Sequence, residues 1–303
     1  MNQRLGEFDR IEHYFRPLAT DPSVGLNLTD DAALITPSHG YETVVSTDTL
    51  VEGVHFLANS DPFRLGQKLL RVNLSDMAAM GARPRYYFLA MTLPKDTPET
   101  WLHAFTDGLA RDQETFGVTL GGGDSTQTAG PIVLTITMMG EVPIGQALRR
   151  DRGEPGDKLL VSGTIGDGYL GLMVAQGGLN GLSEAALDYL MKRYETPNPR
   201  VSLATALAGN EVRACLDVSD GLVADVGHLA HRSGVTARLD LSAIPLSAPA
   251  REAVTAGFVT IEQLVTGGDD YEIIFAVSPT AYDRLAEALQ ADEFLPKVSV
   301  IGE

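Results

Sequence analysis

Hydrophobic side chains recur along this chain at two spacings that predict its helices and strands. Apolar residues three and four apart are typical of amphipathic helices, and short apolar or alternating runs are typical of strands. The helical spacing is clearest over residues 62–80, where Leu65, Leu69, Val72 and Met80 form one stripe. The same spacing predicts helices at residues 8–17, 98–116, 183–194, 201–208, 222–231, 249–256 and 280–289.

The stretches between these helices predict an α/β (α+β) fold of two domains. Strands are predicted at residues 42–50, 86–93, 118–120, 132–140, 158–162, 214–218, 235–241, 271–277 and 298–301. The apolar run 32–35 is expected to pair with the strand at 42–50 in a hairpin. Residues 142–156 are rich in Gly, Pro and Arg, and they are expected to link a mixed-sheet domain, 1–142, to an α/β layer domain, 143–303.

The composition excludes several classes of protein. A chain of 303 residues, 44% of them hydrophobic, can bury a large core. Its longest apolar runs are shorter than the ~20 residues that span a bilayer, and residues 1–18 lack the apolar segment of a signal peptide. The single cysteine, Cys215, indicates a reducing cytoplasm.

The charge of the chain argues against nucleic acid as a partner. Lys and Arg number 23 and Asp and Glu number 40, which gives a net charge of −17. No basic stripe in the sequence could follow a phosphate backbone. An anionic ligand would therefore need cations in order to bind, and divalent metals held by carboxylates are the usual supply.

One acid interrupts the helical stripe of residues 62–80. Asp76 occupies a position where the spacing predicts a hydrophobic side chain, so it is expected to face the core. An ionised carboxylate in apolar surroundings costs several kcal/mol unless it is paired, hydrogen-bonded or bound to a metal. Two interpretations stay open: a structural Asp held by backbone amides, or a metal ligand.

Similar acids lie at strand ends and turns elsewhere in the chain. They are Asp30, Asp48, Asp124, Asp217, Asp220, Asp269 and Asp270, with Ser46 and Thr47 next to Asp48. Without Asp269 and Asp270 but with Asp76, these residues form an oxygen-only set that lacks cysteine and paired histidines, which suits Mg²⁺ or Ca²⁺ and argues against zinc. Ser219 and Asp220 also have the pattern of an N-cap for the helix at 222–231, which leaves Asp217 and Asp225 unexplained.

Two glycine-rich stretches have either a binding or a structural interpretation. The glycines at 121–123 would let the backbone approach a ligand next to Asp124, or they would form a tight turn. The stretch 163–168 reads G-x-x-G-x-G, which is not the dinucleotide fingerprint G-x-G-x-x-G, and it is expected to serve helix packing.

One histidine and one group of arginines also allow two interpretations. His55 lies in a predicted loop after the strand at 42–50, as a site residue or as an ordinary surface residue. Arg149, Arg150 and Arg152 could clamp phosphates, or they could line a solvated linker. The sequence has no P-loop, no kinase H-R-D or D-F-G and no G-x-S-x-G elbow. Hard-cation ligands without a covalent nucleophile favour phosphoryl transfer from a nucleotide.

Several longer motifs resemble those of the thiamine-monophosphate kinase family. They are S-T-D-T-L-V-E-G-V-H-F at 46–56, N-L-S-D-M-A-A-M-G at 73–81, G-G-D at 122–124, D-V-S-D-G-L at 217–222 and G-G-D-D-Y-E at 267–272. The resemblance implies the two-domain fold of aminoimidazole-ribonucleotide synthetase and a homodimer in the cytoplasm. It also implies ATP-dependent phosphorylation of thiamine monophosphate to thiamine diphosphate by direct in-line transfer, assisted by several Mg²⁺ ions.

The resemblance also implies a role for individual residues. Magnesium ligands would be Asp30, Ser46, Thr47, Asp48, Asp76, Asp124, Asp217 and Asp220. ATP would be contacted by Gly123, Asp124, Arg150 and Ser219, and the substrate by His55 and Asp269. The catalytic acids would be Asp48, Asp76, Asp124 and Asp217. The N-terminal domain, 1–142, would bind metal and ATP and would form the dimer.

Two other functions remain as alternatives to this one. A related enzyme of the same fold would act on another acceptor, and a nucleotide- or metal-binding module would bind Mg-ATP without turnover. Family members continue past the position of Glu303 into an aromatic-bearing tail that helps to hold thiamine. The resemblance therefore implies that residues 1–303 bind Mg-ATP normally and thiamine monophosphate weakly.

Overall fold

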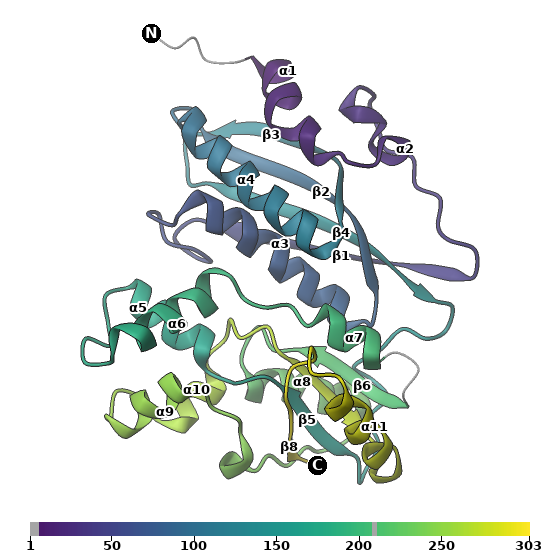
Figure 1. The fold of residues 1–303 in the computed structure, drawn as a ribbon, viewed down its shortest axis with the longest axis vertical. Coiled ribbons are helices and arrows are strands. Elements are labelled where there is room, and N and C mark those ends of the chain that lie inside the picture. The colour runs from purple at the N-terminus through teal and green to yellow at the C-terminus, as the bar shows by residue number, and fades with distance from the viewer. Residues whose placement is uncertain (1–5, 208–210) are drawn as a thin grey trace. The chain divides into compact units, whose positions relative to one another are not determined.

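The chain forms two compact units, which we describe from a computed structural model covering residues 6–207 and 211–303 (Figure 1). The described residues of Met1–Met77 and Arg83–Ile144 form the first unit, and Ala78–Ala82 with Gly145–Glu303 form the second. Residues 1–5 of the predicted first domain, and Ala208 at the end of one predicted helix, lie outside the described residues. No helix in the described part of the chain is long and apolar enough to cross a membrane.

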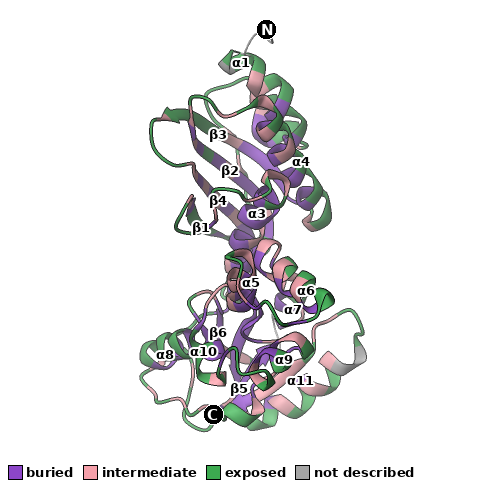
Figure 2. Cartoon of the chain, turned by 90° about the vertical axis from the view of Figure 1, so that its left-hand side faces the viewer, coloured by how far each residue is buried: buried purple, intermediate pink, exposed green. Residues whose placement is uncertain are grey.

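The first unit is a four-stranded mixed sheet with its long helices on one face (Figures 1 and 2). The strand order is β1-β4-β2-β3, with β2 and β3 parallel and the other neighbours antiparallel. The strands are β1 (Tyr41–Val51), β2 (Arg83–Pro94), β3 (Thr119–Thr128) and β4 (Val133–Pro143). The helical segments are α1 (Glu7–Arg10), η1 (Ile11–Phe15), η2 (Arg16–Leu18), α2 (Pro22–Gly25), η3 (Leu26–Leu28), α3 (Pro62–Ala79) and α4 (Glu99–Phe116).

Two glycines allow α3 and α4 to approach each other closely. A Cβ atom on Gly66 of α3 would lie 2.3 Å from the carbonyl oxygen of Phe105, and one on Gly108 of α4 would lie 1.9 Å from that of Phe63. Both distances are far below van der Waals contact, so only glycine fits at these positions. The helix pair therefore packs backbone against backbone over the sheet.

Strand β1 separates its side chains between the two faces of the sheet. Val44 and Leu50 are buried, whereas Val45, Thr47 and Thr49 are exposed, as the alternation of a strand requires. Thr47 pairs through its hydroxyl with Thr137 of β4 at 3.0 Å, and Thr49 pairs with Thr135 at 2.8 Å. The face opposite α3 thus carries valine and paired threonine side chains.

The second unit is a four-stranded sheet of order β6-β7-β5-β8 with helices on both faces. Its strands are β5 (Lys158–Ser162), β6 (Val212–Asp217), β7 (Ile273–Val277) and β8 (Val298–Gly302). Its helices are α5 (Asp167–Ala175), α6 (Glu184–Glu195), α7 (Val201–Leu207), α8 (Leu222–Ser233), η4 (Leu241–Ala243), α9 (Ala248–Thr255), α10 (Ile261–Thr266) and α11 (Pro279–Ala291). The predicted α/β class is confirmed.

The strands of the second unit bury both of their faces. In β5, Leu159 and Val161 join a core cluster with residues of α8, whereas Leu160 joins another with residues of α7 and α11. Cys215 of β6 belongs to the second of these clusters, where burial raises the pKa of its thiol. Strands covered on both faces are uniformly apolar, which is why the run at 158–162 was predictable.

Three predicted features differ from the structure. Residues 32–35 form no strand, because β1 pairs with β4 and the Leu34 amide bonds to the Val24 carbonyl at 3.0 Å. Residues 235–241 make only an isolated bridge, from Leu239 to Gly302, and α10 was not predicted. Strand β3 also does not end at its glycines but continues through Asp124 to Thr128.

The close contact between α3 and α4 makes Gly108→Ala a test of this packing. The added methyl group meets backbone that cannot move aside, so we expect the free energy of unfolding to fall by ~3 kcal/mol or more. Gly227→Ala is the matched control, since Gly227 lies in α8 with nothing within 4 Å of a Cβ atom and should gain ~1 kcal/mol. Chemical denaturation would measure the free energy of unfolding of both variants. Equal effects of the two substitutions would contradict the close contact between α3 and α4.

Candidate functional site

Asp76 finds its partner on the neighbouring sheet. The side chain is half-buried in α3, and its carboxylate accepts a hydrogen bond from the hydroxyl of Ser46 on β1. Asp48 lies two residues further along β1, so its side chain is on the same face as Ser46. The structure therefore places three of the predicted ligands, Ser46, Asp48 and Asp76, on one side of the sheet at strand β1.

Asp124 lies at the opposite edge of that sheet. Asp48 of β1 pairs across the sheet with Ile136 of β4, which pairs with Leu89 of β2, which in turn pairs with Gly123 of β3. Three strand spacings of ~4.8 Å therefore place Asp48 ~14 Å from Gly123. The next residue, Asp124, also points to the other face, which it shares with Thr47. Within one chain, Asp48 and Asp124 are too far apart to bind the same ion.

Asp124 instead lines a cavity of about 610 Å³ within the first unit. Gly123 lies next to it in the wall, and Asp30 and Asp31 line the cavity from the turn after η3. Both Asp30 and Asp124 are exposed, and each accepts a hydrogen bond from the following backbone N–H at 2.9 Å. The cavity thus collects the acids of two predicted motifs.

His55 is held in one tautomer by the turn that follows β1. Its ring Nδ1 accepts a hydrogen bond from the backbone N–H of Val51 at 3.1 Å, and the backbone N–H of His55 donates to the Val51 carbonyl at 2.9 Å. Because Nδ1 is an acceptor, the neutral ring carries its proton on Nε2. The exposed imidazole therefore presents a single N–H donor from a fixed turn.

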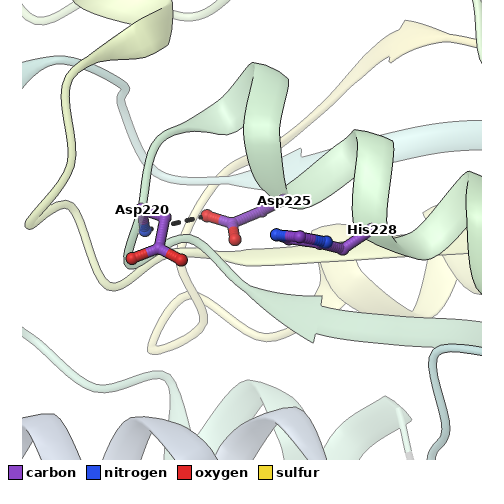
Figure 3. Close-up of side chains that lie close together, drawn as sticks. All are labelled: Asp220, Asp225 and His228. Atoms are coloured by element: carbon purple, nitrogen blue, oxygen red, sulfur yellow. Dashed lines mark hydrogen bonds between the residues drawn. The ribbon is translucent and has the colours of Figure 1, made fainter.

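In the second unit, Asp225 organises the loop between β6 and α8 (Figure 3). Its Oδ2 accepts hydrogen bonds from the backbone N–H groups of Ser219, Asp220 and Gly221 at 3.1, 3.1 and 3.2 Å. Figure 3 draws the bond from Asp220. The N-cap of α8 is Gly221, without a side-chain cap, so the prediction of a cap by Ser219 and Asp220 is wrong. Asp217 is buried where β6 ends.

Asp220, Asp225 and His228 form a compact set of possible ligands. One ligand atom from each lies within 4.8 Å of the others, and Figure 3 shows Asp225 between its two neighbours. Asp220 and His228 are exposed, whereas Asp225 is buried and burial raises its pKa. Within the described residues this is the one such group of His, Cys, Asp or Glu, and His228 was not predicted.

The segment before β7 packs against this loop. The Asp269 amide bonds to the Ser219 carbonyl at 2.9 Å, and a Cβ atom on Gly268 would lie 2.4 Å from the same oxygen. Asp269 is half-buried and has a left-handed backbone, with φ of 69°. The structure thereby brings Ser219 and Asp269, which were predicted from separate motifs, to one place in the second unit.

Asp270 fastens the same segment to the glycine-rich turn before α5. Its carboxylate accepts hydrogen bonds from the amides of Gly166 and Gly168 at 2.7 and 3.0 Å. A Cβ atom on Gly168 would lie 2.1 Å from the Asp269 carbonyl, and Gly166 has φ of 91°. Gly168 therefore serves a backbone contact with Asp269, whereas Gly166 packs against Leu264 of α10, in line with the predicted role in helix packing. Burial raises the pKa of Asp270 to about 8 despite these donors.

The buried acids beside Asp270 are matched by arginines. Glu272 accepts hydrogen bonds from Arg193 at 2.9 Å and from Nε of Arg200 at 2.6 Å. Arg193 also lies 3.7 Å from Asp167. Asp167, Asp270 and Glu272 are fully buried, so their charge has to be balanced within the protein. When Asp270 holds a proton, the other two acids are matched in number by the guanidinium groups of Arg193 and Arg200.

The arginines near residue 150 are not equivalent. Nε of Arg149 bonds to Asp151 at 2.8 Å, whereas the side chain of Arg150 is exposed and has no such partner among the described residues. The backbone carbonyl of Arg150 accepts a hydrogen bond from Ser233 at 3.1 Å, which fixes its position in the chain. The guanidinium of Arg150 is therefore available to a ligand, unlike that of Arg149.

Sequence reasoning identified the acids but missed several of their neighbours. Asp225 was noted without a role, and His228 was overlooked, although the spacing D-x-x-H places both on one helix face. The apolar lining of the cavity, which includes Phe15 and Phe88, gave no signal because apolar strand and helix positions are assigned to the core by default.

Comparison with known proteins now defines the class of this chain. Residues 29–142 match the N-terminal domain of AIR synthase related proteins, and residues 154–303 match their C-terminal domain. The crystal structure of thiamine-monophosphate kinase from Stenotrophomonas maltophilia K279a is 41% identical, with a TM-score of 0.86 over 99% of this chain and 94% of that one. The chain is thus a two-domain protein of the AIR synthase related class, as the motifs predicted.

Two further comparisons define the family within that class. The thiamine-monophosphate kinase of Caulobacter vibrioides is 42% identical over 300 residues, which are 98% of this chain and 83% of that protein. A solved complex of AaThiL with AMPPCP and TMP is 29% identical, with a TM-score of 0.78 over 100% of this chain and 93% of that chain. This chain belongs to the thiamine-monophosphate kinase family.

The raised pKa of Asp270 predicts a pH dependence of stability. The folded state retains a proton that the unfolded chain releases above pH ~4, so this contribution to stability is lost as the pH rises from ~4 to about 8. We expect a slope of up to ~1.4 kcal/mol per pH unit from this group, and Asp270→Asn should remove it. Denaturant unfolding between pH 5 and 8 measures the free energy of unfolding of the wild type and of Asp270→Asn. Parallel pH profiles would show that Asp270 does not hold this proton.

Proposed function

We propose that this chain transfers the γ-phosphoryl group of ATP to thiamine monophosphate. The principal support is the 42% identity to the thiamine-monophosphate kinase of Caulobacter vibrioides over 98% of the chain. A relative of the same fold was solved with AMPPCP, an analogue of ATP, and with TMP. ADP and thiamine diphosphate are the products of the reaction.

The transfer is a direct in-line displacement. A phosphate oxygen of thiamine monophosphate forms a bond to the γ-phosphorus of ATP, and the bond to the β–γ bridging oxygen breaks with its electron pair remaining on ADP. A phosphate monoester has a second pKa of about 6, so the acceptor oxygen is mostly ionised at neutral pH. No side chain of this protein has to remove a proton.

The lining of the cavity is consistent with a requirement for cations. Asp30, Asp31 and Asp124 line it, and none of its described lining residues is Lys, Arg or His. A polyphosphate would be repelled there unless cations accompany it. Mg²⁺ would be held by Asp30, Ser46, Asp48, Asp76, Asp124, Asp217 and Asp220, and when bound it would neutralise the charge on the phosphates. Thr47 was predicted with them, but its hydroxyl lies on the opposite face of β1 and pairs with Thr137.

The remaining residues bind and orient the two substrates. Gly123, Asp124, Arg150 and Ser219 contact ATP, with Arg150 supplying fixed positive charge to the phosphates. His55 donates its Nε2–H to the acceptor, since the Val51 amide holds Nδ1. Asp269 contacts the thiamine moiety from a segment that a backbone hydrogen bond holds to Ser219. Asp48, Asp76, Asp124 and Asp217 are the acids on which catalysis depends.

Homodimer formation in the cytoplasm would complete the site. Asp48 and Asp124 lie at opposite edges of one sheet, so a single chain cannot bring both to the same ion. A second copy that places its Asp124 beside the first copy's Asp48 would remove this obstacle. The exposed valine and threonine face of β1 and β4 supplies a surface for such an interface.

A coupled assay of thiamine diphosphate formation tests the activity. We expect turnover with ATP, Mg²⁺ and thiamine monophosphate, and loss of turnover when a chelator removes the metal. Selenide and aminoimidazole precursors are the matched alternative acceptors, because related enzymes of the same fold would use them. Binding of Mg-ATP without turnover of any acceptor would instead indicate a binding module.

Mixed dimers of two inactive variants test the shared site. Asp48→Asn and Asp124→Asn should each be inactive, but a 1:1 mixture should recover about a quarter of the wild-type activity, because half of the random dimers are mixed and each has one intact site. Asp48→Asn with Asp76→Asn is the control, since both acids lie on one side of the same sheet. No recovery in the first mixture would place both acids in one copy.

Arg150→Ala should raise the KM for ATP about tenfold and leave the KM for thiamine monophosphate nearly unchanged. The reason is the loss of a charge-assisted contact to the nucleotide phosphates. Arg149→Ala is the matched control, because Arg149 is already bonded to Asp151. Steady-state kinetics on both substrates give the comparison, and equal effects of the two substitutions would indicate a general charge effect.

A further inference from the structure

Asn73 places an unpaired oxygen atom in the core of the first unit. The residue belongs to α3 and is fully buried. Its amide nitrogen donates a hydrogen bond to the Leu69 carbonyl at 2.9 Å, and this bond fixes the orientation of the amide group, because only the nitrogen can donate. The side-chain oxygen, Oδ1, has no hydrogen-bond partner within the described part of the chain.

An unpaired oxygen in the core is unfavourable unless it has a use. Burial removes its hydrogen bonds to water and returns none, which lowers the stability of the folded state. Leucine has nearly the size of asparagine and would avoid this loss, and leucines fill the buried positions 69, 70 and 74 of the same helix. A buried acceptor of this kind is explained when a group that binds during function supplies the donor.

Two contacts give the direction in which α3 crosses the sheet. Asp76 contacts Ser46 of β1, whereas the next residue, Met77, reaches Gly140 of β4. A Cβ atom on Gly140 would lie 2.9 Å from Sδ of Met77. Gly140 pairs with Val44, which precedes Ser46 in β1. A step forward along α3 is thus a step back along β1, and the two elements run antiparallel.

This direction brings Asn73 to the side of the predicted magnesium ligands. Asn73 precedes Asp76 by three residues, so the two side chains share one face of α3 with their Cβ atoms ~5–6 Å apart. The step from Asp76 back to Asn73 follows β1 from Ser46 towards Asp48. The Asp48 side chain is on the same face of the sheet as Ser46, the face that α3 covers. The unpaired oxygen therefore lies near both acids.

We propose that Asn73 is a positioning residue of the magnesium site, whose Oδ1 accepts a hydrogen bond from a water molecule of the hydrated cation at Asp48 and Asp76. This rests on the proposed function, which makes the two acids magnesium ligands. Mg²⁺ keeps several of its waters when carboxylates bind it. A neutral amide oxygen can orient such a water from the core, and it adds no further negative charge beside the two acids.

Asn73→Leu tests this role, because it removes the oxygen and nearly keeps the size of the side chain. We expect the variant to bind Mn²⁺, a paramagnetic substitute for Mg²⁺, about tenfold more weakly, as for the loss of one hydrogen bond to a charged group. Its free energy of unfolding without metal should equal or exceed that of the wild type, since the unpaired oxygen is gone. Electron paramagnetic resonance of free Mn²⁺ gives the affinity, and denaturant unfolding gives the stability.

Two further variants separate this role from a general effect on the core. Thr106→Val is the control, because Thr106 is buried in α4 and bonds back to the Leu102 carbonyl at 3.0 Å, as Asn73 does to Leu69. It should leave the Mn²⁺ affinity unchanged. Asn73→Ser retains an oxygen acceptor in a smaller side chain and should keep the affinity within about threefold of the wild type, which tests the role even if Asn73→Leu does not fold.

Three results would overturn the proposal. They are an unchanged Mn²⁺ affinity in Asn73→Leu, an equal loss of affinity in Thr106→Val, and a loss in Asn73→Ser as large as that in Asn73→Leu. Asp76→Asn separates this failure from that of the proposed function. If Asp76→Asn weakens Mn²⁺ binding and Asn73→Leu does not, only the role of Asn73 is refuted. If neither variant changes the affinity, the magnesium assignment of Asp76 fails with it.

Discussion

Buried carboxyl groups in this chain accept hydrogen bonds from fixed donors, and this requirement separates its acids into two groups. Asp225 accepts three backbone N–H groups, Asp270 accepts two, and Glu272 is bonded to two arginines. These acids hold loops in place. Asp124 and Asp220 form the second group, and both are exposed. Asp124 lines the cavity, and Asp220 lies in the loop that Asp225 holds. The structural acids thus determine where the exposed acids are presented.

The sequence predicted the regular elements well wherever burial imposed a pattern, as in α3 and β5. It failed where a tertiary partner decided the outcome. Residues 235–241 alternate like a strand, but only residues 238–240 exchange backbone hydrogen bonds with the end of β8, and they make one isolated bridge instead of a strand. The backbone N–H groups of residues 219–221, just before α8, bond to Asp225 within the helix, an arrangement that local capping rules do not consider. The candidate acids were predictable from residue type, but their grouping depends on strand order.

Strand order has a larger effect on the site than any single residue. The motifs containing Asp48 and Asp124 are separated by two further strands once β4 and β2 take their places between β1 and β3. Spacing along the chain contains no information on this separation, because β4 comes last in sequence and lies in the middle of the sheet. Acids at both edges of one sheet are too far apart to share an ion. This separation is the physical argument for including a second copy in the proposed function.

The position of Cys215 has a practical consequence for studying such an assembly. The thiol lies in the core between β6 and the helices on one face, and its raised pKa suppresses the reactive thiolate. It is also the only cysteine in the chain. A cysteine introduced on an exposed position of β1 or β3 would therefore be the one thiol that a maleimide or a nitroxide reagent modifies in the folded protein. Spin labels placed in this way could report distances between copies with every native acid left in place.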